Sequence, residues 1–445
     1  MQEPTKLFNR NYLTLWIAQL VSKLGTQAFQ IALLFTVKEL TGSASIMGAF
    51  ALITGIPAIL LGPVGGVFAD RYSRKKIIIL SDFLRGVFIL SLALLMWKQP
   101  QATTLILGWL LAVSVGSAII TSFFGPAISA VIPDLVPKER VAGANSMGQL
   151  SNQISAILGL TVGGVVYGAV GGLVLLFFDA FSFLFASGAE LFVRFPQHKP
   201  SQSTGLRDKF DTFKKDVVEG MHYVWNRTGL RNFVLLSMLL TFFGAPVVIL
   251  LTFYVQDVMQ VGPAWYGILL SFYGFGSMLG FVLAGAINLP SRQRARVMFV
   301  GILAQAVFYG SLGLAPNIWV AAALMAAHGI ASGYVQVHIT SIMQVSTPSD
   351  IRGRVFGLLA AMSGALAPLA LGFAGLVIDL LDKNIRLIFM GSGVIMFLLS
   401  LLMLSSRPTL ELLSFDYKAK PKTPDEVLAA EQQEQAAMAG EEAVL

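Results

Sequence analysis

Three ionisable residues, Lys23, Asp179 and Glu190, lie inside long apolar stretches of the 445-residue chain. A charged side chain is costly inside a bilayer and by default marks an ion or substrate pathway. Asp179 has no cation in its own apolar stretch, and a bound proton would remove its charge. We therefore predict that these three residues are candidates for proton coupling, with Asp179 the first among them.

Each of these candidates also has a purely structural interpretation. Asp179 could be a hydrogen-bonded acid beside Ser182, and Lys23 could extend toward the membrane surface or form a structural pair. Glu190 lies four residues before Arg194, which is the spacing of a helical ion pair. The sequence leaves these alternatives open.

A glycine-and-charge motif occupies residues 62–76, GPVGGVFADRYSRKK. Glycines four residues apart let a neighbouring helix approach closely. The charged part cannot lie in hydrocarbon, so it predicts a tight turn at the membrane surface. Asp82 and Arg85, three residues apart in the next apolar stretch, can pair on one helical face. We interpret these groups as a cytoplasmic gate, with Arg352 and Arg354 nearby. Its members are Gly62, Gly66, Asp70, Arg71, Arg74, Asp82 and Arg85.

A third group of residues is polar without being charged. Gln19, Ser22, Thr26 and Gln30 follow one face of the first apolar stretch at helical spacing. That face is predicted to line a central cavity. For His328, a lone packed histidine is the alternative. The predicted cavity residues are Gln19, Ser22, Thr26, Gln30, Asn152, His328 and Gln336.

The composition places all of these residues in an integral membrane protein. The chain is 55% hydrophobic and only 12% charged, whereas soluble domains carry about 25% charged residues. It contains no cysteine, which excludes disulfides, thiolate metal sites and cysteine catalysis. The phosphate-binding pattern G-x-x-x-x-G-K-[ST] is absent from the sequence, so ATP is not expected to drive the protein directly. We expect no enzyme activity, no cofactor and no metal site.

Twelve apolar stretches are long enough to cross a membrane, which takes about 20 residues. They predict an all-α protein with twelve transmembrane helices. The predicted spans are 12–37, 44–69, 77–97, 103–130, 144–168, 171–193, 231–255, 264–288, 296–315, 318–343, 355–380 and 385–405.

Basic residues alternate between the connections of these spans. One side holds 25 of the 31 Lys and Arg residues, and the excess of positive charge marks the cytoplasmic side. We therefore predict a multi-pass protein of the inner membrane with both termini in the cytoplasm. The net charge of +7 is then a signal of topology rather than of nucleic-acid binding. We expect a monomer whose partners are the lipid bilayer, protons and a small amphipathic substrate.

The two halves of the chain resemble each other. Residues 10–12 correspond to 231–233, and the motif at 62–76 corresponds to residues 280–294. Two pseudo-symmetric six-helix bundles would give this repeat, with substrate bound between them. We predict bundles over 1–194 and 229–406, a linker over 195–228 and a flexible tail over 407–445. The linker pattern indicates an amphipathic helix on the membrane surface, with a solvated linker helix as the alternative.

Several segments resemble the major facilitator superfamily, in the drug-efflux branch of the macrolide exporters and the enterobactin exporter. The motif at 62–76 is similar to the signature loop of that superfamily. The other segments are RNYLTLWIAQLVSKLG, LTGSAS, IPDLVPKERVAGANS, FFDAFSFLFA and TPSDIRGRVFGL. Antiporters of this kind carry Gly-Pro-x-x-Gly-Gly in the fifth span, whereas this chain has Leu160 in place of the proline.

The resemblance implies a secondary transporter that works by alternating access. Our favoured hypothesis is export of amphipathic, macrolide-like compounds by proton-coupled antiport. A second hypothesis is export or flipping of one defined metabolite, a siderophore or a lysophospholipid. A third is a membrane sensor or assembly factor that transports nothing.

Overall fold

The computed structural model describes residues 7–195, 206–287 and 289–415. Within them, twelve helical segments are long and apolar enough to cross a membrane, as predicted. The seventh segment is continuous in space but consists of α8, α9 and the π-helical turn η2. The helices and helical turns are α1 (Arg10–Thr41), α2 (Ala44–Arg71), α3 (Arg74–Lys98), α4 (Thr103–Leu135), η1 (Lys138–Arg140), α5 (Val141–Val170), α6 (Gly172–Leu191), α7 (Leu206–Trp225), α8 (Thr228–Gly244), α9 (Val247–Phe253), η2 (Tyr254–Val258), α10 (Ala264–Ala286), α11 (Ser291–Ser311), η3 (Leu312–Leu314), α12 (Ile318–Ser346), α13 (Ser349–Leu380), α14 (Ile385–Ser405) and α15 (Arg407–Leu413).

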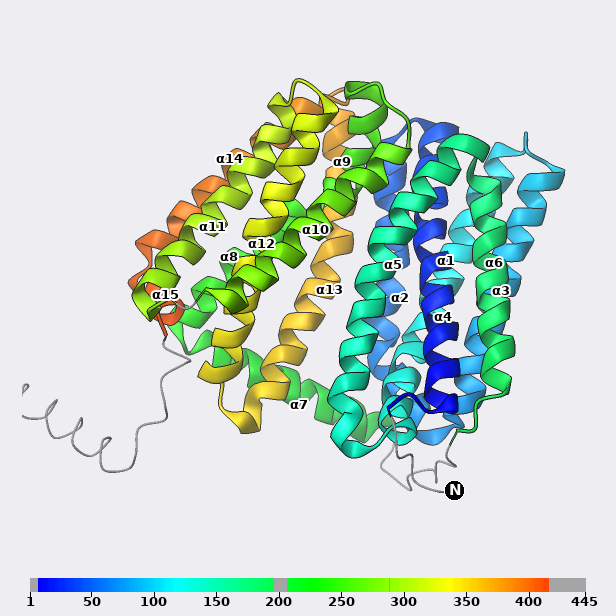
Figure 1. Cartoon of the computed structure of the whole chain (residues 1–445), viewed down its shortest axis with the longest axis horizontal. Helices are drawn as coiled ribbons and strands as arrows, with labels where there is room; N and C mark the ends of the chain where they lie inside the picture. Colours follow the sequence, from blue (N-terminus) through cyan, green and yellow to red (C-terminus); the bar gives the residue numbers. More distant parts are fainter. Residues whose placement is uncertain (1–6, 196–205, 288, 416–445) are drawn as a thin grey trace, which may run out of the picture.

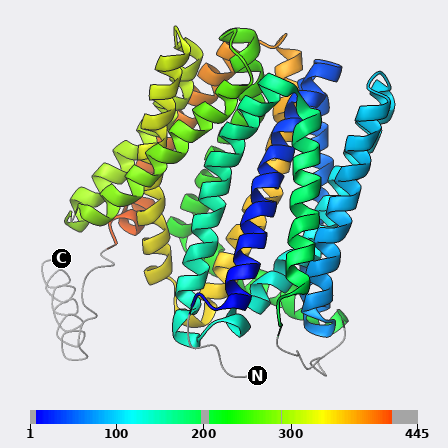
Figure 2. The same cartoon turned by 45° about the vertical axis from the view of Figure 1, so that its right-hand side comes forward.

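These helices form two bundles that meet along two helix pairs. In the first bundle α1 packs against α5 and α6, α3 against α4 and α6, and α2 against α4 (Figures 1 and 2). In the second bundle α10 packs against α12, and α11 packs against α12 and α14. The bundles meet where α2 packs against α13 and α5 against α10. This is the predicted arrangement of two six-helix bundles.

The bundles are packed together at one end of the molecule and diverge at the other. We call these the α9 end and the α7 end, after the helices that lie there (Figure 1). At the α9 end, a Cβ on Gly375 of α13 would lie 2.3 Å from the Ala44 carbonyl oxygen of α2. A Cβ on Gly164 of α5 would lie 3.0 Å from the carbonyl oxygen of Pro263, which precedes α10. Figure 1 shows α5 and α10 separating toward the α7 end.

The glycines of the predicted gate are not at a close helix contact. A Cβ on Gly62 or Gly66 would meet no atom within 4 Å. The close approach on α2 falls instead at Gly65, where a Cβ would lie 1.9 Å from the Ser122 carbonyl oxygen of α4. The expectation of close packing at Gly62 and Gly66 is therefore wrong for this structure, because no neighbouring helix approaches the backbone at these two positions.

The linker contains the predicted helix, α7, which contacts α2, α8 and α13 at the α7 end (Figure 1). Glu219 of α7 forms an ion pair with Arg354 of α13, and Tyr223 donates to the Ser346 carbonyl oxygen over 3.4 Å. The placement of α7 on a lipid surface stays a prediction. Part of the predicted tail is ordered, because residues 407–413 form α15 against α8. The remainder of the tail, 416–445, lies outside the described residues.

The close contact at Gly375 gives a test of closure at the α9 end. We expect Gly375→Ala to force α13 away from α2 and to cost about 1–3 kcal/mol of stability, as overpacking does. Gly364→Ala on the same helix is the matched control, because its Cβ would enter open space. Thermal unfolding of the purified protein should show a lower Tm for Gly375→Ala alone. Equal Tm values for the two variants would contradict the packing described.

Candidate functional site

A cavity of about 680 Å³ lies in the second bundle, between α8, α10, α11, α12, α13 and α14. Its volume falls within the range of pockets for drug-sized ligands. The walls are mostly apolar, and methionine is the most distinctive component. Methionine has a flexible, polarisable side chain that adapts to ligands of different shape. The methionines of the lining are Met238, Met325, Met343, Met362, Met396 and Met403.

A few polar groups are placed within this apolar lining. The His328 Nδ1 atom lies 3.1 Å from the Gln305 carbonyl oxygen, and the hydroxyls of Tyr273 and Ser332 are 3.1 Å apart. The His328 ring also contacts the rings of Tyr273 and Tyr309. Among the described residues that line the cavity, none carries a carboxylate, ammonium or guanidinium group. A ligand in this cavity is therefore held by apolar contact and hydrogen bonds.

The structure divides the predicted cavity residues into two sets. His328 and Gln336 line the cavity, whereas the other five are not among its lining residues. Gln19 donates to the Glu190 carboxyl group, and the buried Ser22 hydroxyl donates to the Gln19 carbonyl oxygen. Gln19 and Ser22 therefore serve contacts inside the first bundle. The five residues outside this lining are Gln19, Ser22, Thr26, Gln30 and Asn152.

A buried acidic cluster lies between α1, α3 and α6 of the first bundle. Asp82 and Glu190 are 0% exposed, and Asp179 is 1% exposed. The Gln19 Nε2 atom donates to Glu190 Oε1 over 2.8 Å and to Asp82 Oδ2 over 3.4 Å. Arg85 interacts electrostatically with Asp82 and Asp179, and its guanidinium carbon lies 4.0 Å from the centre of the Phe183 ring.

This cluster corrects two expectations about ion pairs. Glu190 is 0% exposed and accepts a hydrogen bond from Gln19 of α1, whereas Arg194 is exposed, so the expected pair with Arg194 is not formed. Asp82 and Arg85 join the carboxyl groups of α6 instead of a gate that includes Arg74. The structure thus brings together two residues of the predicted gate, Asp82 and Arg85, and two of the predicted coupling residues, Asp179 and Glu190. Lys23 is half-buried on the neighbouring helix α1.

The signature loop forms its own contacts at the α7 end. Arg74 donates to Asp134 Oδ2 over 2.9 Å and to the Ala130 carbonyl oxygen over 3.0 Å, because α4 extends beyond its predicted end to Leu135. Of the predicted gate network, Arg74 contacts α4, whereas Asp82 and Arg85 lie in the separate acidic cluster. The side chain of Asp70 lies outside the described residues.

The two arginines expected near that loop are engaged elsewhere. Arg352 of α13 donates from Nη2 to the carbonyl oxygen of Thr347, the residue that caps the end of α12, over 3.1 Å. Arg354 pairs with Glu219 of α7. The gating role of the signature loop stays a prediction.

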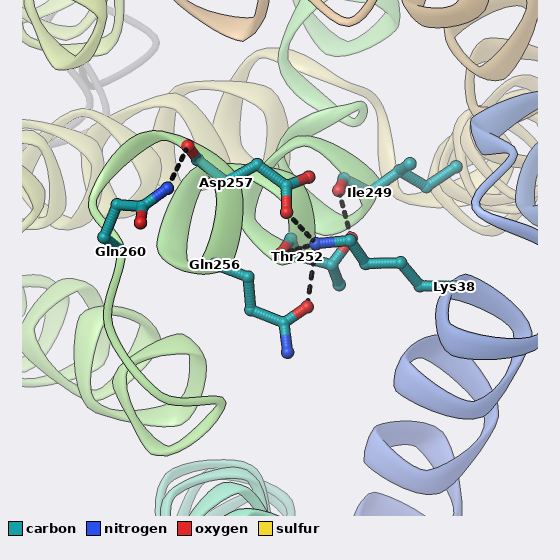
Figure 3. Close-up of polar contacts among 6 residues, drawn as sticks. All are labelled: Lys38, Ile249, Thr252, Gln256, Asp257 and Gln260. Atoms are coloured by element: carbon teal, nitrogen blue, oxygen red, sulfur yellow. Dashed lines mark hydrogen bonds and ion pairs between the residues drawn. The ribbon is translucent and has the colours of Figure 1, made fainter.

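A contact between the two bundles at the α9 end was not anticipated from the sequence. Lys38, near the end of α1, donates to Asp257 Oδ1 over 2.9 Å, to Gln256 Oε1 over 2.7 Å and to the Thr252 carbonyl oxygen over 3.1 Å (Figure 3). We call this contact the Lys38 clamp. The Lys38 Nζ atom also lies 4.7 Å from the centre of the Phe253 ring.

The Lys38 clamp depends on an irregular turn. Gln256 and Asp257 belong to the π-helical turn η2, and π-helical turns are frequent at functional sites. The sequence contains one sign of this contact, because Lys38 is one of the few basic residues on the side of the membrane opposite the predicted cytoplasmic side. Its partners lie more than 200 positions away, so spacing could not identify them.

A second contact between the bundles lies beside the Lys38 clamp. The Asp379 carboxylate of α13 accepts hydrogen bonds from the Ser43 hydroxyl over 2.6 Å and from the Ser45 amide over 2.8 Å. These donors belong to the first turn of α2, so Asp379 caps that helix from the other bundle. The two contacts and the close packing at Gly375 seal the α9 end.

These features define a class: a twelve-helix membrane protein with two bundles, a cavity and closure at one end. The family model described as transmembrane secretion effector matches residues 5–439. The chain therefore belongs to this family of major facilitator transporters.

Two curated relatives and two solved structures agree with that assignment. Macrolide efflux protein A of Streptococcus pyogenes is 24% identical over 390 residues, which cover 86% of this chain and 93% of the relative. The multidrug efflux pump Tap of Mycobacterium tuberculosis is 24% identical over 376 residues, which cover 81% and 85%.

The solved structures are less similar in sequence but share the fold. The D323A mutant of the nucleoside transporter NupG has a TM-score of 0.67 at 16% identity, and the match covers 88% of this chain and 100% of that one. A bacterial homologue of the human lysosomal transporter Spinster, in an inward-facing and occupied conformation, has a TM-score of 0.67 at 17% identity and covers 90% and 97%.

The Lys38 clamp yields a conformational prediction. Lys38→Gln removes the ion pair with Asp257 and should weaken closure at the α9 end, so more molecules close at the α7 end. Spin labels on Ser146→Cys and Gln344→Cys, two exposed positions near the α7 end, report this as a new population at shorter distance in double electron–electron resonance. The absence of native cysteine makes the labelling specific.

Lys383→Gln is the matched control for this experiment. Lys383 lies at the same end, 6.0 Å from the centre of the Phe253 ring, and forms no ion pair among the described residues. Its variant should keep the parent distance distribution. If Lys38→Gln also keeps that distribution, the contact does not hold the α9 end closed.

Proposed function

We propose that the protein exports amphipathic organic compounds from the cytoplasm by alternating access, in exchange for protons. The observation that carries this proposal is the cavity of about 680 Å³ with its apolar, methionine-rich lining. Macrolides and similar drugs have the size and mixed polarity that such a lining accommodates. The efflux proteins among the relatives support the same substrate class.

The lining also favours one mode of recognition. A carboxylate in the binding site would select compounds with a fixed positive charge, and the described lining has none. Apolar area therefore supplies affinity, while groups such as His328 and Gln336 orient the ligand by hydrogen bonds. Compounds that depend on a permanent charge are poorer substrates in this proposal.

The contacts at the two ends suggest how access alternates. We assign the α7 end to the cytoplasm, since the basic connections lie there. In the present state the α9 end is sealed by Lys38 and Asp379, and the cavity is reached from the cytoplasm. The opposite state would break these contacts and bring the open faces at Gly62 and Gly66 against the second bundle, with the signature loop as the gate.

The acidic cluster supports proton coupling as the energy source. Buried carboxyl groups without enough cations cost several kcal/mol per unpaired charge unless they hold protons. Asp179, Glu190 and Lys23 are the coupling candidates of this proposal. Leu160 at the position of the antiporter proline makes a direct test of coupling necessary.

Drug susceptibility of an efflux-deficient bacterial host tests the function as a whole. Expression of the protein should raise resistance to erythromycin more than resistance to tetraphenylphosphonium, a permanent cation. A proton uncoupler and the gate variant Asp70→Asn should both abolish the gain. Unchanged resistance to every compound, despite confirmed membrane expression, would contradict drug export and favour a siderophore or lysophospholipid substrate.

A single substitution in the cavity tests the mode of recognition. Gln336→Glu places a carboxylate in the neutral lining with little change in shape, so resistance should shift from erythromycin toward tetraphenylphosphonium. Asn152→Asp is the control, because Asn152 is exposed and outside this lining. The ratio of the two inhibitory concentrations is the readout. Equal ratios in both variants would rule out this cavity as the site of recognition.

A further inference from the structure

The cavity of the second bundle has two unlike walls. The helices α10, α11 and α12 supply every imidazole, phenol and carboxamide of the described lining, whereas α8, α13 and α14 supply four of the six methionines. On the methionine wall, formed by α8, α13 and α14, the polar lining side chains are Ser237, Thr241 and Ser363. The helix α12 packs against α10 and α11, and α8 packs against α13 and α14. A ligand between the walls therefore meets hydrogen-bonding groups on one side and apolar groups on the other.

The polar wall contains a regular row of side chains on α12. Four residues advance an α-helix by about 6 Å and return to nearly the same face. Polar residues recur at this interval over about 18 Å of the helix, so an extended ligand can meet several of them at once. We call this row the α12 stripe. Its members are His328, Ser332, Gln336 and Thr340, and all four line the cavity.

His328 presents a hydrogen-bond acceptor to the cavity. The Gln305 carbonyl oxygen can only accept, so the His328 Nδ1 atom, 3.1 Å away, must carry a proton and donate it. A second proton on Nε2 would create a cation that no carboxylate of the described lining balances. Nε2 therefore keeps a free lone pair. No described residue donates to Nε2, and the protein does not enclose this atom, so the acceptor is open to a ligand.

The groups around His328 hold it in place and lack some partners of their own. The His328 ring contacts the rings of Tyr273 and Tyr309. Tyr273 and Ser332 share one hydrogen bond over 3.1 Å, which leaves one hydroxyl hydrogen of the two for a ligand. The Tyr309 hydroxyl is buried and has no hydrogen-bond partner among the described residues, a state that native proteins rarely keep without a functional reason.

We propose that the cavity binds uncharged amphiphiles with hydroxyl groups along one edge, and that His328 sets this specificity by accepting a hydrogen bond from one of those hydroxyls. This inference rests on the proposed function and narrows its substrate class. The hydroxyl edge of the ligand lies along the α12 stripe, and the apolar face lies against the methionine wall. An ether in place of the hydroxyl cannot donate, so it leaves Nε2 without a partner and binds more weakly.

Selection by apolar contact alone gives the opposite expectation. Conversion of a hydroxyl to a methyl ether adds apolar surface, and buried apolar surface favours binding. A cavity that selects only by apolar area would therefore prefer the ether. The preference between a hydroxyl compound and its methyl ether thus distinguishes the two modes of recognition.

Equilibrium binding of two matched probes tests the proposal. Methyl cholate is an uncharged steroid ester with its hydroxyl groups on one face, and its O-methylated form keeps the skeleton and the oxygens but has no donor. Both are tritiated and bound to the full-length protein in lipid nanodiscs. The wild type should prefer methyl cholate, and His328→Phe should reduce this preference by roughly three- to tenfold, the effect of one hydrogen bond. An equal preference in the wild type and in folded His328→Phe would overturn the proposal.

Met238→Ala, on the methionine wall, is the matched control for this experiment. Met238 lines the cavity from α8, so the variant should weaken the binding of both probes and leave their ratio as in the wild type. Partition of the probes into the nanodisc lipid is the same for every variant and cancels from this comparison. The Tm of each variant shows whether it folds.

Nuclear magnetic resonance of the wild type gives a test that does not depend on any variant at position 328. The chain has four histidines, which can be labelled with ¹⁵N at Nε2. Saturating methyl cholate should move one unprotonated Nε2 signal upfield, as a new hydrogen bond does, and the O-methylated form should not. The shift should persist when each of the other three histidines is replaced in turn. If methyl cholate binds and moves no such signal, the proposal is wrong.

The outcomes separate this proposal from the proposed function. If the preference for the hydroxyl probe depends on His328 while cells gain no resistance to erythromycin, the export function fails and the binding site stands. If cells export erythromycin while the purified protein binds neither probe, export stands and the narrower substrate class is overturned.

Discussion

The cost of an uncompensated charge away from water governs how this protein distributes its polar groups. In the first bundle, Asp82 and Asp179 lie near Arg85, and Glu190 accepts a hydrogen bond from Gln19, so that each acid has a polar or charged neighbour. In the second bundle, the described cavity lining is free of ionised groups. The two halves arise from one repeated pattern, yet one is suited to hold charge and the other to hold an apolar ligand. In the proposed function, a relative movement of the two bundles connects the acidic cluster with the cavity.

The helices that meet between the bundles carry that connection. Gly375 allows α13 to touch the backbone of α2, and Gly164 allows α5 to touch the residue before α10. Each close contact lies at the α9 end, where Lys38 and Asp379 add charged hydrogen bonds across the same boundary. Packing and electrostatics therefore close the same end, while the glycine face of α2 at Gly62 remains uncovered. This asymmetry is what an alternating-access transporter requires of a single state.

The sequence predicts the helices of this protein but not the contacts between residues of different helices. All twelve spans follow from apolar length, because a bilayer demands it of any crossing helix, and the helix α7 follows from its amphipathic pattern. Contacts between distant residues follow no such rule. Lys38 and Asp257 are 219 positions apart, and Arg74 finds Asp134 because α4 is longer than its apolar core. Glu190 had a plausible partner in Arg194, but the rotation of α6, which spacing alone does not fix, turns it toward Gln19.

The methionines of the cavity have a consequence for how this protein can evolve. Leucine, isoleucine and valine are each one nucleotide change away from the methionine codon, and exchanges among such residues cost a core little stability. Each of the six methionines in the lining is thus a position where a point mutation reshapes the wall without unfolding the bundle. In the proposed function, such exchanges let a population exposed to a new compound adjust the range of ligands by small steps. The charged contacts that close the α9 end join specific pairs such as Lys38 and Asp257, so a single exchange there removes the contact instead of adjusting it.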